Sequence, residues 1–164
     1  MPTVVNGLPA HVLLVHFAVV LIPATALLLI LSVAWPAARE RIGLFGPMLA
    51  LVTVVFVQVT ANAGEWFEEQ VGTFPALEEH TSLGDTMVFW SLGAFLLYAV
   101  WWFISSTRGQ QLLTKSAPVH RIATNKIVLA VVGVIAVVVA LGSLWHGYQV
   151  GDSGAKAVWD GVVS

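Results

Sequence analysis

The sequence predicts an all-α fold, an integral membrane four-helix bundle whose N-terminus and C-terminus both lie on the outer (periplasmic or extracellular) side. The first observation is the composition, because 58% of the 164 residues are hydrophobic and 10% are charged, whereas about a quarter of an ordinary soluble domain is charged. A helix needs about 20 apolar residues to cross the hydrocarbon. The second observation is therefore that four uncharged stretches are long enough to cross, at 1–38, 42–64, 86–107 and 127–151. Together they make residues 1–164 a single membrane domain.

The third observation, the distribution of charge, gives the orientation. Six of the seven basic residues lie between the first and second or the third and fourth stretches: Arg39, Arg41, Arg108, Lys115, Arg121 and Lys126. Lysine and arginine are enriched in cytoplasmic loops. The second loop and the C-terminal tail are instead acidic, and we expect them, with both termini, on the outer side.

Proline and glycine residues predict the boundaries of the helices. We expect helices over about 8–34, 42–70, 75–106 and 125–150. Pro9 falls in the first turn of the first helix, where its missing N–H does no harm, and Pro36 ends that helix. Gly72 suits the left-handed residue that ends the second helix, and Gly151 is expected to end the fourth.

Two further segments follow from this division. Residues 109–125 are expected to form the one long loop, and residues 152–160 a short amphipathic turn on the outer surface. The fourth helix also carries a strip of small residues along which another helix can approach closely, made up of Gly133, Ala136, Ala140 and Ser143.

Several classes of function are excluded or disfavoured. The chain has no cysteine, which excludes disulfides, iron–sulfur clusters and covalently attached c-type haem. A net charge of -2 argues against nucleic acid as a partner, because nucleic acid binds basic faces. The sequence contains no catalytic motif that we recognise, so an electron-transfer or accessory role is favoured over an enzyme.

Histidines gather at the predicted outer ends of the helices. His16 follows His11 by five residues, about 7.5 Å of helix rise, and His146 lies about 6 Å before the expected end of the fourth helix. These depths match, and two imidazoles from different helices can hold the iron of a b-type haem. We therefore expect His16 and His146 as metal ligands, with His80 and His11 nearer the headgroups. A histidine near an interface can also be purely structural.

A polar stripe on the second helix is the other candidate feature. Gln58, Asn62, Glu65 and Glu69 follow one another at spacings of four, three and four residues, which places them on one face. Such a stripe is expensive against lipid, so we expect it to face the bundle interior. There it could orient the histidines, relay protons or hold a quinone head group. Glu65 could instead join three histidines around zinc, copper or iron.

Four segments together resemble a family that is already recognised. They are GLPAHVLLVHF at 7–17, AGEWFEEQVG at 63–72, LEEHTSLGD at 77–85 and GDSGAKAVWDG at 151–161. They are similar to a widespread family of four-helix bacterial membrane proteins classed as a domain of unknown function. In that family the first helix carries His-x-x-x-x-His, matched by His11 and His16, and the start of the third helix carries a histidine, matched by His80.

The resemblance implies a multi-pass protein of the bacterial cytoplasmic (inner) membrane. Some relatives are fused to, or lie beside, cytochrome c modules, which implies a haem or electron-transfer context and a cytochrome or respiratory-complex partner. The chain departs from the family at Ala18, where relatives often have proline, and at Asp152, where relatives have the histidine of Gly-His-Ser-Gly. The second departure removes a candidate ligand and gives more weight to His146.

Three hypotheses of function follow. The first is a protein of the lipid bilayer that binds haem b near the outer face and transfers electrons. The second is a non-catalytic accessory or structural subunit of a membrane complex, or a homo-oligomer, suggested by the strip of small residues. The third is a transition-metal binding or transport site built from His11, His16, His80 and Glu65.

Overall fold

The computed structural model describes residues 4–159. Four long helices dominate it: α1 (Ala10–Ala34), α3 (Phe45–Val71), α4 (Pro75–Ser105) and α7 (Lys126–Trp159). Within the described residues they are joined by three short helices, α2 (Pro36–Ile42), α5 (Thr107–Leu113) and α6 (Ala117–Ala123). A two-stranded antiparallel hairpin, β1 (Val4–Val5) and β2 (Leu8–Pro9), precedes α1. The all-α bundle is confirmed, and all four long helices are long and apolar enough to cross a membrane.

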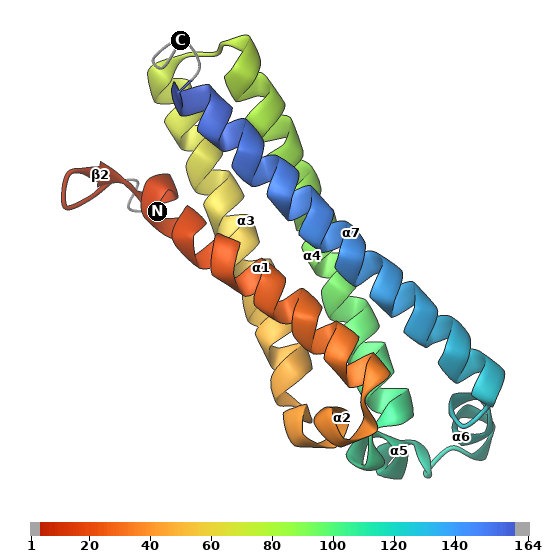
Figure 1. Cartoon of the computed structure of the whole chain (residues 1–164). Coiled ribbons are helices and arrows are strands. Elements are labelled where there is room, and N and C mark those ends of the chain that lie inside the picture. Colours follow the sequence, from red (N-terminus) through yellow and green to blue (C-terminus); the bar gives the residue numbers. More distant parts are fainter. Residues whose placement is uncertain (1–3, 160–164) are drawn as a thin grey trace.

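The bundle has two chemically different ends (Figure 1). The short helices α2, α5 and α6 lie at one of them, which we call the basic end because six of the seven basic residues lie there. The turn between α3 and α4 and the C-terminal part of α7 lie at the other, which we call the acidic end. The side of the membrane that each end faces stays a prediction from the charges.

All four long helices exceed the length that a bilayer requires, and three of them exceed it most. The helices α3, α4 and α7 contain 27, 31 and 34 residues, or about 40, 46 and 51 Å at 1.5 Å per residue. The hydrocarbon core is about 30 Å thick. Because the uncharged stretches of α4 and α7 reach almost to the basic end, the surplus length lies mostly at the acidic end.

Small side chains allow the long helices to pack closely. Helix α1 packs against α3 and α7, and α4 packs against the same two helices from the other side. Gly133, Ala136, Ala140 and Ser143 are all buried on α7. A Cβ atom at Gly133 would lie 3.3 Å from both Trp101 and Val33. The strip of small residues therefore serves packing inside the bundle, while large apolar side chains such as Val20 and Ile127 point outward, as lipid contact requires.

The starts of the first two helices differ from the sequence prediction. Helix α1 begins at Ala10 because Leu8 and Pro9 pair with the strand before them, through a turn at Asn6 and Gly7 that has positive φ angles. The second long helix begins at Phe45 rather than at 42, because α2 ends at Gly43, where φ is 52°. The predicted stop at Gly72 is confirmed, with φ of 79°.

The later boundaries contain two corrections. The expected loop 109–125 is mostly helical, since it holds most of α5 and all of α6. The expected end at Gly151 and the separate turn over 152–160 are wrong, because α7 continues unbroken to Trp159, and residue 160 lies outside the described part of the chain. One glycine in a helix costs only about 1 kcal/mol, and the Lys156–Asp152 ion pair of 2.7 Å supports the extension.

Candidate histidine site at the acidic end

His11 is held by the neighbouring helix α3. Its Nδ1 lies 3.0 Å from the backbone oxygen of Thr60. A carbonyl oxygen can only accept, so Nδ1 carries the proton and the lone pair of the neutral ring is on Nε2. The ring also lies against Gly64, where an added Cβ would come within 3.0 Å of it. The backbone of α3 therefore fixes both the orientation and the tautomer of His11.

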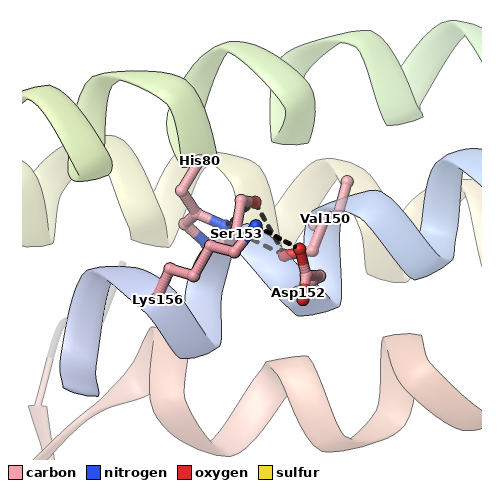
Figure 2. A network of polar contacts seen from close by, with 5 residues as sticks. All are labelled: His80, Val150, Asp152, Ser153 and Lys156. Carbon is pink, nitrogen blue, oxygen red and sulfur yellow. Dashed lines mark hydrogen bonds and ion pairs between the residues drawn. The ribbon is translucent and has the colours of Figure 1, made fainter. Parts of the chain in front are cut away.

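His80 is held in the same way by α7 (Figure 2). Its Nδ1 lies 3.1 Å from the backbone oxygen of Val150 and 3.2 Å from Oγ of Ser153. Ser153 itself donates to Val150 over 3.1 Å, so its Oγ is free to accept from the imidazole. A Cβ atom at Gly154 would come within 2.9 Å of the ring. Here too the proton is on Nδ1 and the lone pair is on Nε2.

The two rings lie next to each other at the acidic end in a T-shaped arrangement. Their centroids are 6.1 Å apart and their planes are nearly perpendicular, at 79°. Neither Nε2 atom has a hydrogen-bond partner among residues 4–159. The site thus presents two imidazoles from different helices, each oriented through its Nδ1 atom and each with an Nε2 atom that has no partner among the described residues, just above the expected surface of the hydrocarbon.

The structure does not bring His16 and His146 together. His16 is exposed on the outward face of α1, and its Nδ1 donates to the backbone oxygen of Val12 on its own helix over 2.8 Å. His146 is buried, with its Nε2 2.9 Å from the backbone oxygen of Leu83 and its ring stacked on Trp90. The sequence matched the depths of these two residues, but depth does not fix the direction in which a side chain leaves its helix.

The polar stripe of α3 faces outward, so the expectation that it lines the bundle interior is wrong. Gln58, Asn62, Glu65 and Glu69 are all exposed, while the opposite face buries Ala50, Thr53, Val57 and Thr60. The Gln58 amide donates to Oδ1 of Asn62 over 2.7 Å, which lowers the cost of the exposed amides. The two carboxylates lie toward the acidic end of α3.

Glu65 is exposed and therefore lies away from the bundle interior, where the sequence predicted that it could act as a metal ligand. Across residues 4–159, no three side chains of histidine, aspartate or glutamate converge as the ligands of a metal ion. The histidine pair stands by itself, without a third such side chain beside it.

Sequence reasoning missed the residues that hold the pair. Thr60 and Val150 act through backbone oxygens, which leave no signal in the residue type. Gly64 and Gly154 do carry a signal, because a glycine on a long helix leaves room for a large side chain of a neighbouring helix. Gly64 lies against the His11 ring and Gly154 lies against the His80 ring. Ser153 was placed in a surface turn and was missed because α7 was expected to end before it.

Searches of protein-family models, curated proteins and solved structures give no match to this chain. The fold and the site therefore define a class only: an all-α protein with four apolar helices suited to a lipid bilayer, and with a pair of histidines at one end.

Proposed function

We propose that this protein binds b-type haem at the acidic end of the bundle through His11 and His80 and serves in electron transfer. The observation that supports this most directly is the pair of imidazoles with ring centroids 6.1 Å apart and with their Nε2 atoms unused. Two axial imidazoles on one iron, each with a bond of about 2 Å, would have ring centres roughly 6 Å apart. His11 and His80 thus replace His16 and His146 as the proposed ligands.

The number of ligands favours haem over a bare metal ion. Zinc and copper sites usually take three or four protein ligands, whereas haem iron asks the protein for no more than two axial ligands, because the porphyrin supplies the other four. A set of two histidines, without a third ligand among the described residues, suits the second case. The same comparison argues against a transition-metal site built from the four side chains His11, His16, His80 and Glu65.

The chain's own residues prepare the ligands. Donation from Nδ1 to a backbone oxygen fixes the tautomer and makes Nε2 a better electron donor, as is usual for metal-bound histidine. Gly64 and Gly154 let the rings lie directly against the helix backbones. Haem bound there would supply a one-electron redox couple. At this end of the bundle, the group would be reachable by a partner outside the membrane.

Optical spectroscopy tests the proposal. The full-length protein, purified in detergent after expression with added haem precursor, should show a Soret band and a reduced-minus-oxidised difference spectrum. His11→Ala and His80→Ala should each change or abolish these bands, while His120→Ala, at the basic end, should leave them unchanged. A colourless protein after supplementation with hemin would overturn the proposal. Bands that depend on His16 and His146 instead would overturn the ligand assignment alone.

One observation favours a second candidate, an accessory subunit of a membrane complex. Gln58 follows Phe45, the start of α3, by 13 residues, or about 20 Å of rise, so this exposed amide falls within the depth of the hydrocarbon. Asparagine and glutamine side chains promote association between membrane helices. Replacing Gln58 and Asn62 with leucine should then reduce the size of the complex on a native gel, whereas Val55→Leu should not. An unchanged size would remove this candidate.

A further inference from the structure

A second site lies at the basic end, away from the histidine pair. A hollow of about 740 Å³ opens between α2, the start of α3, the end of α4, and α5. Ligand sites commonly measure 300–1,000 Å³, so the volume admits a small molecule or a lipid headgroup. Its lining includes Arg41 and Arg108, the indole of Trp102, and the apolar residues Leu44 and Phe45.

The two arginines of the hollow are not used by the fold. Across residues 4–159, neither Arg41 nor Arg108 forms an ion pair or a side-chain hydrogen bond, and both are exposed. Arg39, close by, contrasts with them, because it donates to the backbone oxygens of Ser32, Val33 and Ser105 and lies 4.8 Å above the ring of Trp101. Arg39 is structural, while Arg41 and Arg108 leave two guanidinium groups at the hollow.

The remaining polar groups of the hollow also favour an anion. Glu40 lines it, but Oε1 of this carboxylate accepts from the backbone N–H of Thr107 over 3.1 Å and so ties α2 to α5. Trp102 is 8% exposed, and its buried Nε1 has no hydrogen-bond partner among the described residues. The hollow therefore carries an excess of positive charge.

The position of the apolar residues identifies the kind of anion. Leu44 and Phe45 are 50% and 63% exposed and lie at the start of α3, where the membrane-crossing part of that helix begins. A ligand that touches them and both arginines must have a negative head and an apolar tail. Basic pockets at the ends of membrane helices are typical sites for anionic lipid headgroups.

We propose that this hollow binds the phosphodiester headgroup of an anionic phospholipid, with Arg41 and Arg108 on the phosphate and Leu44 and Phe45 against the first part of the acyl chains. A free phosphate offers the same chemistry to the arginines but leaves the apolar residues unused. The proposal is independent of haem, because the hollow lies at the opposite end of the bundle.

Native mass spectrometry of the delipidated full-length protein tests it, with phosphatidylglycerol and phosphatidylcholine of matched chains as probes. The wild type should retain phosphatidylglycerol more tightly. In the double variant Arg41→Gln with Arg108→Gln, its apparent affinity should fall about tenfold to thirtyfold. The matched double variant Lys115→Gln with Arg121→Gln removes the same charge from the same end, outside the hollow lining, and should change the affinity less than about twofold.

Three results would overturn the proposal. The first is equal loss of affinity in the two double variants, which would show a general charge effect. The second is equal retention of the two lipids by the wild type. The third is displacement of the lipid by millimolar inorganic phosphate or glycerol 3-phosphate, which would identify a soluble phosphate as the ligand. Circular dichroism of each variant establishes that the helices have formed.

Discussion

At the acidic end of the bundle, His11 and His80 each reach a backbone oxygen on another helix, whereas at the basic end Arg41 and Arg108 reach no acceptor among the described residues. The first pair is oriented by the helices before any ligand arrives. The second pair lies on short helices at the rim of an open hollow. The difference teaches that a bundle can prepare one end for a group that needs fixed geometry and leave the other adaptable to a charged and less specific ligand.

Substitution of Arg39 should have the largest effect on stability, because this arginine of the basic end makes contacts within the fold. Arg39→Gln removes hydrogen bonds to three backbone oxygens and a cation–π contact. We expect the free energy of unfolding in detergent to fall by about 2–3 kcal/mol.

Arg41→Gln is the matched control for that measurement. It lies two residues away, is exposed, and should change the unfolding free energy by less than about 0.5 kcal/mol. Equal losses in the two variants would remove the distinction between structural and unused arginines.

Glycine substitutions examine the other end. Gly154→Ala places a Cβ within 2.9 Å of the His80 ring, so the ring must shift from its backbone acceptor. We expect a loss of about 1–2 kcal/mol in unfolding free energy, measured by thermal or denaturant unfolding.

The control here is Gly151→Ala, one turn earlier on α7, where an added Cβ meets nothing within 4 Å. Alanine in a helix is favoured over glycine by roughly 0.5–1 kcal/mol, so this variant should be slightly more stable than the wild type. If Gly154→Ala were also stabilising, the ring would not be held as tightly as the contacts indicate.

Ser153→Ala should have the smallest effect. It removes one of two acceptors of the His80 Nδ1 proton and leaves the Val150 oxygen in place. The expected loss is about 0.5–1 kcal/mol. In a haem-loaded protein it should also shift the midpoint potential, because donation from Nδ1 tunes the ligand. A Ser153→Thr variant keeps the hydroxyl and should behave as the wild type, whereas a Ser153→Ala variant as stable as the wild type would show that the contact does not stabilise the site.

The sequence was sufficient to predict the four-helix architecture, because a membrane-crossing helix requires a long uncharged stretch and such stretches are visible in the sequence. The four uncharged stretches located the four long helices, and Gly72 and Pro75 marked the turn between α3 and α4. The end of α7 could not be predicted, since one glycine disfavours a helix by only about 1 kcal/mol and the contacts of Ser153 and Gly154 with α4 are tertiary.

The site was predicted less well than the fold, for a geometric reason. Helix rise gives the depth of a residue, so His11, His16, His80 and His146 were placed near one end. The rotation of each helix about its own axis is set by which face packs inward, and that depends on partners far away in the sequence. His16 on the outward face and His146 against Leu83 show the result, as does the outward stripe from Gln58 to Glu69.

The backbone oxygens that hold the two histidines lie far apart in the sequence, on α3 and on α7, so they become available at different times during synthesis. Since chains emerge from the N-terminus, the Thr60 oxygen that holds His11 is made as soon as α3 is complete. The Val150 oxygen that holds His80 comes with the last helix. A nascent chain released before α7 can therefore arrange one imidazole but not its companion, and only a finished protein can present the two together.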